Sequence, residues 1–292
     1  MLSSSSAVCL AVLTSASSLA LAQQATNQPI EQTAPTFWTQ HNRYAELNTG
    51  TYQQNYREQD TQGLTADGSL DTETGDQNSI GLALRWQTTG GWLLHLQAQR
   101  QSGVTDYRGY LQAGNGSLTP YRARTGNTAS QISVNVGYAL NTRNWSAMPA
   151  NWQITPLVQI GQHHWERNLV QYGETYDYTT QAMGALVQWQ ARPGTVLELQ
   201  ALVGQTQSAS VKVPVLGFAA EQTGNDFHEW QLGLSQDLGA ITGKEALAGW
   251  RVTARYTDSQ YGHGASPLVN GLQAPPNQHR PSSWTLGLQK QF

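Results

Sequence analysis

Residues 282–292, SSWTLGLQKQF, alternate between apolar and polar side chains up to the last residue of the chain. The apolar parity holds Trp284, Leu286, Leu288 and Phe292. Lys290 is the one interruption of that series. Successive side chains of a β-strand point to opposite faces, so a period of two indicates a strand with one apolar and one polar face. The chain therefore ends on a strand that closes with a large aromatic residue.

The same alternation recurs along most of the chain and predicts an all-β protein. In residues 78–87 (NSIGLALRWQ), apolar side chains occupy every even-numbered position from Ile80 to Trp86. A helical period of apolar residues is not evident in any segment. We expect ten strands, at about 36–56, 77–87, 92–112, 128–140, 152–169, 176–190, 195–210, 226–237, 250–261 and 282–292.

Two folds give each strand one apolar and one polar face. In a soluble β-sandwich the apolar faces form the core, whereas in a transmembrane barrel they meet lipid and the polar faces line the interior. Gly and Ala recur on the polar faces, which favours a crowded lumen. The connections favour the barrel more strongly, because short turns alternate with long polar segments, as in outer-membrane barrels. The short and medium turns are 88–91, 141–151, 191–194 and 238–249. The other connections are 57–76, 113–127, 170–175, 211–225 and 262–281, of which 170–175 is the one short exception.

Aromatic residues gather at the strand ends beside the short turns. Amphipathic rings prefer the membrane–water interface, and a sandwich core gives no reason for Trp to cluster at strand ends. We therefore expect an aromatic belt made of Trp86, Trp92, Trp152, Trp189, Trp250 and Phe292. The predicted fold is a single antiparallel transmembrane β-barrel of ten strands, with short periplasmic turns and long extracellular loops.

The composition agrees with such a surface. Of the 292 residues, 12% are charged and 38% apolar, whereas about 25% charged residues are usual in a soluble domain. The net charge of −3 gives no basic footprint for nucleic acid. After the first 22 residues, no apolar run approaches the roughly 20 residues that a transmembrane helix needs.

The N-terminus has the features of an export signal. Residues 7–21 are apolar or small, and Ala20-Leu21-Ala22 is a cleavage signal before Gln23. We predict a signal peptide at 1–22, a flexible leader at 23–35 and the barrel at 36–292. The single cysteine, Cys9, lies in the signal peptide. The mature chain is therefore expected to have neither a disulfide nor a thiol nucleophile.

The C-terminal segment Thr285–Phe292 resembles the assembly signal of bacterial outer-membrane β-barrel proteins. A polar residue is followed by Gly287, then by apolar residues and a terminal aromatic, and Lys290 departs from the pattern. The resemblance is to the superfamily and covers the mature chain. It implies recognition by the barrel-assembly machinery, residence in the cell outer membrane of a diderm bacterium, and contact with membrane lipid and lipopolysaccharide.

Strand parity directs a set of charged side chains into the lumen. Both charge signs occur among these residues, and isolated charges in a narrow lumen are costly. We expect them to form an ion-pair network that plugs the barrel. The alternative is a narrow polar pore in which the three arginines attract anions. The lumen set is Glu46, Arg85, His95, Glu198, Glu229, Arg251 and Arg255.

Asp226-Phe-His228, at the loop end of the eighth expected strand, is a candidate for catalysis. It is similar to the Asp-x-His pair of the omptins, ten-stranded surface proteases in which a carboxylate orients a general base. The family's Asp-x-Asp partner is missing, since the third strand offers Asp106 alone. His228 also shares its parity with outward apolar residues. Asp106, Asp226 and His228 are therefore weak catalytic candidates for an omptin-like protease or a lipid A-modifying enzyme.

Other histidines give no defined site. His163 and His164 are adjacent and point to opposite faces of a strand, so they cannot bind one metal ion together. His263 lies among small residues of the last loop. We expect no metal and no cofactor. The sequence favours a non-enzymatic outer-membrane barrel with a plugged polar lumen, whose surface loops bind an extracellular ligand or mediate adhesion. A surface hydrolase and a narrow pore are the alternatives.

Overall fold

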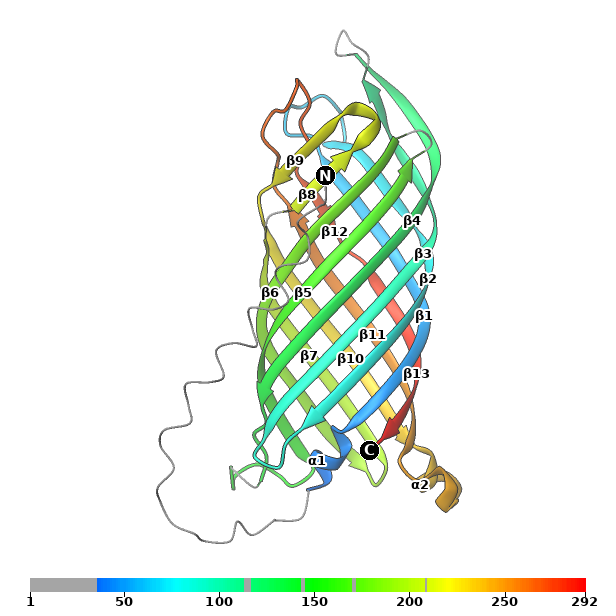
Figure 1. Ribbon diagram of the computed structural model, residues 1–292, viewed down its shortest axis with the longest axis vertical. Helices are drawn as coiled ribbons and strands as arrows, with labels where there is room; N and C mark the ends of the chain where they lie inside the picture. The colour runs from blue at the N-terminus through cyan, green and yellow to red at the C-terminus, as the bar shows by residue number, and fades with distance from the viewer. Residues whose placement is uncertain (1–35, 113–116, 143–144, 170–171, 208) are drawn as a thin grey trace, which may run out of the picture. The chain divides into compact units, whose positions relative to one another are not determined.

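The computed structural model describes residues 36–112, 117–142, 145–169, 172–207 and 209–292. In this part of the chain, ten long strands form a closed antiparallel barrel (Figure 1). The expected signal peptide and leader lie outside the described residues. The barrel strands are β1 (Tyr44–Gln59), β2 (Ser69–Gln87), β3 (Trp92–Gln112), β4 (Leu118–Tyr138), β5 (Trp152–Leu169), β6 (Tyr172–Arg192), β7 (Thr195–Thr206), β10 (Asp226–Asp237), β11 (Trp250–His263) and β13 (Ser282–Gln291).

The last strand closes the barrel. β13 pairs with β11 on one side and with β1 on the other, where Tyr44 lies opposite Gln291 and Gln53 opposite Ser282. Every barrel strand therefore has two hydrogen-bonded neighbours, as lipid requires of a spanning sheet. The prediction of a ten-stranded antiparallel barrel is confirmed.

The strands extend beyond the predicted limits. β2 begins at Ser69 and β4 at Leu118, so much of the predicted loops 57–76 and 113–127 is strand. These extensions are polar on both faces, and a period-two search for apolar residues cannot detect them. The prediction of a strand from residue 36 was wrong, because Phe37–His41 form the short helix α1, which begins at the N-cap Thr36. There the Thr39 amide donates to the Thr36 hydroxyl at 3.2 Å.

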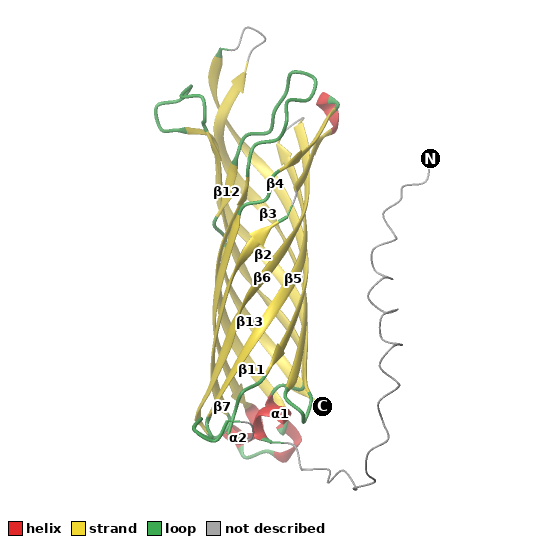
Figure 2. Cartoon of the chain, turned by 90° about the vertical axis from the view of Figure 1, so that its left-hand side faces the viewer, coloured by secondary structure: helices red, strands yellow, loops and turns green. Residues whose placement is uncertain are grey.

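Smaller elements mark the two ends of the barrel (Figure 2). At one end lie α1, α2 (Leu238–Thr242), the 3₁₀ turn η3 (Glu245–Leu247) and the C-terminus; we call it the helical end. The other, which we call the hairpin end, carries β8 (Ala209–Val213), the 3₁₀ turn η2 (Pro214–Leu216), β9 (Phe218–Gln222) and β12 (Asn277–His279). β8 pairs with β6, and β12 bridges β1 and β11.

No helix in the described residues is long and apolar enough to span a membrane.

The outer wall carries an apolar band around the lower and middle barrel. On β2, for example, Ile80, Leu82 and Leu84 are 56%, 62% and 40% exposed. So much exposed apolar surface is unusual for a water-soluble monomer and suits lipid. Toward the helical end, Trp86, Trp92 and Phe292 are also exposed. Trp152 and Trp189 stack on neighbouring strands with ring centroids 5.7 Å apart.

The contacts of Lys290 at the helical end explain how a charge fits on the apolar face of β13. Its Nζ lies 5.0 Å from the centroid of the Trp250 ring and donates a 3.3 Å hydrogen bond to the Ala248 carbonyl. A lysine can keep its stem along apolar surface while its ammonium reaches polar groups beyond it. The apolar face of β13 therefore tolerates this charge near its end.

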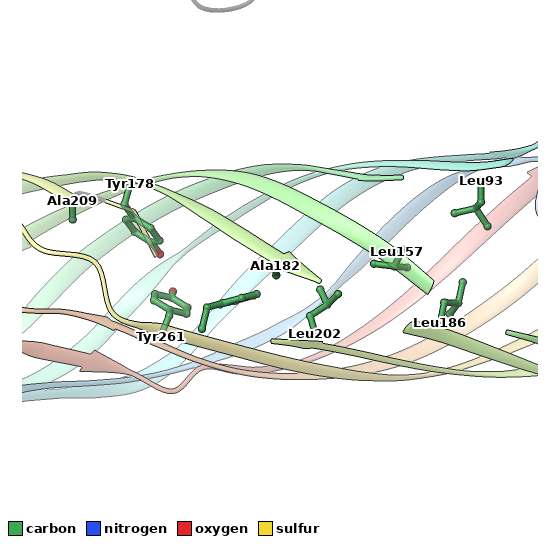
Figure 3. Packing of buried hydrophobic residues seen from close by; sticks show 9 residues of the cluster. Leu93, Leu157, Tyr178, Ala182, Leu186, Leu202, Ala209 and Tyr261 are labelled. Carbon is green, nitrogen blue, oxygen red and sulfur yellow. The ribbon is translucent and has the colours of Figure 1, made fainter. Parts of the chain in front are cut away.

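The interior is mixed rather than uniformly polar. Figure 3 shows the side chains of one buried apolar cluster, which runs along the inner wall between strands that are distant in the sequence. Polar and charged side chains fill the remaining cross-section. The apolar cluster consists of Leu93, Leu157, Tyr178, Ala182, Leu186, Leu202, Ala209, Phe227 and Tyr261.

Candidate functional site

The first feature of the lumen is an ion pair that crosses it near the helical end. Arg85 on β2 donates from Nη1 to Oε1 of Glu198 on β7 at 2.7 Å. Five steps around the ten-stranded barrel separate β2 from β7, so the pair joins opposite walls. The Arg85 side chain is fully buried, and Gln188 also donates to Glu198 at 2.6 Å. This pair spans the width of the lumen.

A layer of buried amides adds to this bridge. Asn42, which follows α1, donates to Gln87 on β2 at 2.7 Å and to Gln188 on β6 at 2.9 Å. Gln153 on β5 donates to the same two carbonyl oxygens, at 3.0 and 2.9 Å. The four side chains are at most 1% exposed. The short helix α1 thus places an amide where it links several walls of the barrel.

A second ion pair lies on the other side of the lumen. Arg255 on β11 donates to both carboxylate oxygens of Glu46 on β1, at 2.9 and 3.3 Å. Gln289 on the intervening β13 donates to Glu46 at 2.7 Å. Arg251 donates instead to the His41 carbonyl at 3.0 Å. Two of the three lumen arginines therefore have a carboxylate within 3 Å.

Two residues of the expected lumen set stand apart from these pairs. His95 is buried, at 2% exposure. Its Nε2 has no hydrogen-bond partner among the described residues. Glu229 accepts a 3.1 Å hydrogen bond from Ser259, and no ion pair of the described chain joins it to an arginine. It lines a small polar cavity of about 70 Å³ with Tyr52, Gln97 and Gln131. A space of that size holds only a few waters.

A third charged cluster lies toward the hairpin end, beyond the apolar band, and is centred on Arg167 of β5. Its guanidinium contacts Glu73 Oε2 at 2.6 Å, Glu174 Oε2 at 2.9 Å and Asp71 Oδ2 at 3.0 Å. Glu58 is 3.7 Å away. We call these five residues the Arg167 cluster. Because β5 and β2 are three steps apart around the barrel, the cluster also crosses the lumen.

Aromatic and polar side chains enclose the Arg167 cluster. The guanidinium carbon lies 5.0 Å from the Tyr56 ring centroid and 5.2 Å from that of Tyr107, within range of a cation–π contact. Glu73 also accepts hydrogen bonds from Thr105 and from Asn127, the latter at 2.6 Å. The Arg167 side chain is 1% exposed and that of Glu73 fully buried.

The Arg167 cluster has more carboxylates than cations. Four carboxyl groups surround one guanidinium. Burial, opposed by Arg167 and assisted by nearby carboxylates, raises the pKa of Asp71 to about 6. Burial and the neighbouring Asp71 raise the pKa of Glu58 well above its usual range. Desolvation and like charges both favour the neutral acid, so the cluster retains protons under mildly acidic conditions.

The lumen set predicted from the sequence contains none of the five residues of the Arg167 cluster. Asp71 and Glu73 fall in the segment 57–76 that was expected to be a loop. A signal was present, because Ser69, Asp71 and Glu73 share one parity and are all buried. It could not be recognised without knowing that the strand continues past the apolar band.

The three catalytic candidates are exposed. Asp226 and His228 flank Phe227, which points inward and is 2% exposed. Asp106 on β3 lies opposite Arg124, on the outer wall. No hydrogen bond or ion pair of the described residues joins any two of Asp106, Asp226 and His228. They therefore form no assembled nucleophile, base or water site in this structure.

The remaining histidines also lack a metal geometry. His164, on the outer wall, contacts Asp177 at 2.7 Å and Glu166 at 3.3 Å. His263 contacts Asn277 at 3.3 Å. Within the described ranges, no group of three or more His, Cys, Asp or Glu side chains has an arrangement that could hold a metal ion.

Comparison with known proteins identifies the fold. Among solved structures, the chain is similar to the outer membrane protease OmpT from Escherichia coli, with a TM-score of 0.57 and 10% sequence identity over 87% of this chain and 98% of that one. The chain has an outer-membrane β-barrel fold. At this identity the likeness shows the fold alone.

Two other outer-membrane structures are less similar. The β domain of the Bordetella autotransporter BrkA has a TM-score of 0.40 and 14% identity, over 85% of this chain and all of that one. Neisserial surface protein A has a TM-score of 0.35 and 9% identity, over 85% of this chain and 97% of that one. No family model matches the chain, and no curated protein sequence is significantly similar to it.

Proposed function

We propose that this chain is a non-enzymatic protein of the bacterial outer membrane, with a closed lumen and a binding surface at its hairpin end. The observation that carries the proposal is the crossing of the lumen at two levels. Arg85 and Glu198 join opposite walls at 2.7 Å, and Arg167 joins β5 to β2 at 2.6 Å. Buried side chains occupy the path that a solute would take through a narrow pore.

The hairpin end supplies the surface for binding. Val215 and Leu216 at the tip of the β8–β9 hairpin are 59% and 48% exposed. Leu268, in the loop between β11 and β12, is 70% exposed. These residues lie beyond the apolar band, so lipid does not account for their exposure. Large apolar side chains exposed to water beyond the membrane are candidates for contact with a protein partner. We call Val215, Leu216 and Leu268 the tip residues.

The loops that carry the tip residues are held in place by packing. Phe218 and Val213 of the hairpin belong to a buried cluster that includes Ala274 of the other loop. Gln222 Nε2 donates to the Pro275 carbonyl at 2.8 Å. A preorganised loop binds a partner at a lower cost in conformational entropy than a mobile one. This arrangement supports binding or adhesion rather than conduction.

The hydrolase alternative gains no support from the geometry, because Asp106 and His228 lie on the outer wall of different strands. A protease among the solved structures of the same fold does not change this, since fold alone does not imply function.

The test is adhesion by cells that display the full chain. Val215→Ser combined with Leu268→Ser should reduce cell–cell aggregation and attachment to polystyrene by several-fold. The matched control is Ile241→Ser, because Ile241 is 60% exposed at the helical end. Equal aggregation by the double variant and the parent would contradict the proposed surface. Display of each variant is measured by surface labelling of the cells.

A further inference from the structure

The outer wall of β3 and β4 carries a row of exposed basic side chains. Arg108 lies directly opposite Arg122 in the antiparallel pair, and Arg124 lies two residues further along β4. Arg100 is on the same outward parity of β3, nearer the helical end. All four are exposed. We call Arg100, Arg108, Arg122 and Arg124 the arginine row.

The charges of this row are not neutralised within the described protein. No ion pair or side-chain hydrogen bond of the described residues involves the guanidinium of Arg108, Arg122 or Arg124. Like charges directly opposite each other in a β-ladder are destabilising. Elsewhere on the outer wall Lys212 does form an ion pair, with Asp177 at 3.9 Å. An anion between Arg108 and Arg122 would remove the repulsion.

The surface between the two strands is shaped to receive such an anion. Arg108, Arg122 and Arg124 line one shallow groove, together with Asp106, Tyr107 and Ala123. Asp106 lies opposite Arg124 and is the one acidic residue of the groove. Three guanidinium groups against one carboxylate leave the groove positive. Guanidinium forks match phosphate oxygens in pairs and bind them with charge-assisted hydrogen bonds.

The position of the row indicates where the anion comes from. On β3 the continuous series of apolar outward residues ends at Ala98, so Arg100 lies at the edge of the apolar band, above which Val104 is a single exposed apolar residue. Arg108 is eight residues further, which is about 27 Å along a strand at about 3.4 Å per residue. With a strand tilt of about 40° this is about 20 Å above the edge of the band. Figure 1 shows β3 and β4 continuing to the hairpin end at this side of the barrel.

A ligand for this row must therefore be anchored in the same membrane and carry anionic groups well above it. We propose that the arginine row binds the phosphate groups of the lipopolysaccharide core, with Arg108, Arg122 and Arg124 as the phosphate ligands. Arg100 lies at the height of the lipid headgroups and supports the same contact. This inference rests on the proposed outer-membrane location but not on the tip residues or on adhesion.

The test measures binding to protein purified from membranes in detergent. The probes are soluble core oligosaccharide released from lipopolysaccharide, the same oligosaccharide after removal of its phosphates, and inorganic phosphate. We expect the phosphorylated oligosaccharide to bind at least about tenfold more tightly than either of the other two. The affinity should fall as salt increases, because exposed charges are screened.

A variant that combines Arg108→Gln, Arg122→Gln and Arg124→Gln should bind the phosphorylated oligosaccharide at least about tenfold more weakly. The matched control combines Lys212→Gln, Lys244→Gln and Arg280→Gln, which removes three positive charges from exposed positions outside the groove. This control should bind within about twofold of the parent.

Three results would overturn the proposal. Equal affinity for the phosphorylated and dephosphorylated oligosaccharides would exclude phosphate recognition. Equal loss of binding in the two triple variants would indicate a general charge effect. Inorganic phosphate bound as tightly as the oligosaccharide would point to a free anion rather than a glycolipid. The arginine variants keep the tip residues, so cell–cell aggregation should be unchanged in them. Aggregation assays with these variants therefore test the adhesive surface separately from phosphate binding.

Discussion

Replacing Arg167 by Met is expected to destabilise the barrel strongly, and by an amount that depends on pH. The substitution keeps most of the side-chain volume but removes the cation that contacts Glu73, Glu174 and Asp71 within 3.0 Å. Removing one partner of a buried ion pair costs about 3–5 kcal/mol, because the remaining charge stays buried without compensation. We expect a loss of this size in the free energy of unfolding at pH 7.5.

The pH dependence follows from the raised pKa of Asp71. The pKa of this carboxyl is about 6 in the folded barrel, against about 3.9 in an unfolded chain. A group with a raised folded pKa binds protons preferentially when folded. The stabilisation of the folded barrel that this proton binding provides is therefore complete below about pH 4 and is lost as the pH rises through 6. For Asp71 the difference corresponds to about 3 kcal/mol.

Acid should therefore rescue the Arg167→Met variant. Protonation makes Asp71 and Glu58 neutral, because the pKa of each is raised, and the cost of the substitution at pH 4.5 falls toward that of buried neutral polar groups, about 1–2 kcal/mol. The assay is equilibrium unfolding in urea, followed by tryptophan fluorescence in detergent micelles at both pH values. The control is Arg280→Met at an exposed position, where a change within about 0.5 kcal/mol is expected. A loss for Arg167→Met that is equal at pH 7.5 and 4.5 would refute the reasoning.

Three other variants test separate contacts of the barrel. Glu46→Gln should cost about 3 kcal/mol at pH 7.5, because it leaves the Arg255 guanidinium without its carboxylate; an unchanged urea midpoint would contradict this. Lys290→Leu should leave the stability within about 0.5 kcal/mol, since its ammonium already reaches the Ala248 carbonyl at 3.3 Å, and a large gain would show that the charge is buried at a cost. Asn42→Ala combined with Gln153→Ala should cost about 2–4 kcal/mol, because it leaves the buried carbonyl oxygens of Gln87 and Gln188 without donors; a loss below about 0.5 kcal/mol would show that the amide layer does not stabilise the barrel.

The alternation of apolar and polar residues was sufficient to predict the strands and their number, whereas the order of short and long connections and the aromatic residues at strand ends decided for a barrel over a sandwich. The alternation works because lipid selects apolar residues at every second position, as in residues 284–288 of β13. Above the lipid that selection stops, so the first residues of β2 and β4 were read as loops. Helix α1 was missed for a related reason: Phe37–His41 is too short to show a helical period.

Parity predicts which way a side chain points but not which residue it meets. Arg85 and Glu198 are distant in the sequence, and their contact depends on the five-step separation of β2 and β7 around the barrel. Glu229 points into the lumen as Glu198 does, but it accepts a hydrogen bond from Ser259 instead of pairing with an arginine. Its distance from the arginines follows from strand register, which the sequence alone does not determine.

The closed lumen is tested most directly by single-channel recording of the purified protein in planar bilayers. We expect no steady current for the parent protein, because the Arg85–Glu198 pair and the Arg167 cluster cross the path at two levels. Steady ohmic currents whose size or ion selectivity changes with Arg255→Ala would contradict this expectation, and would show that the barrel is a pore.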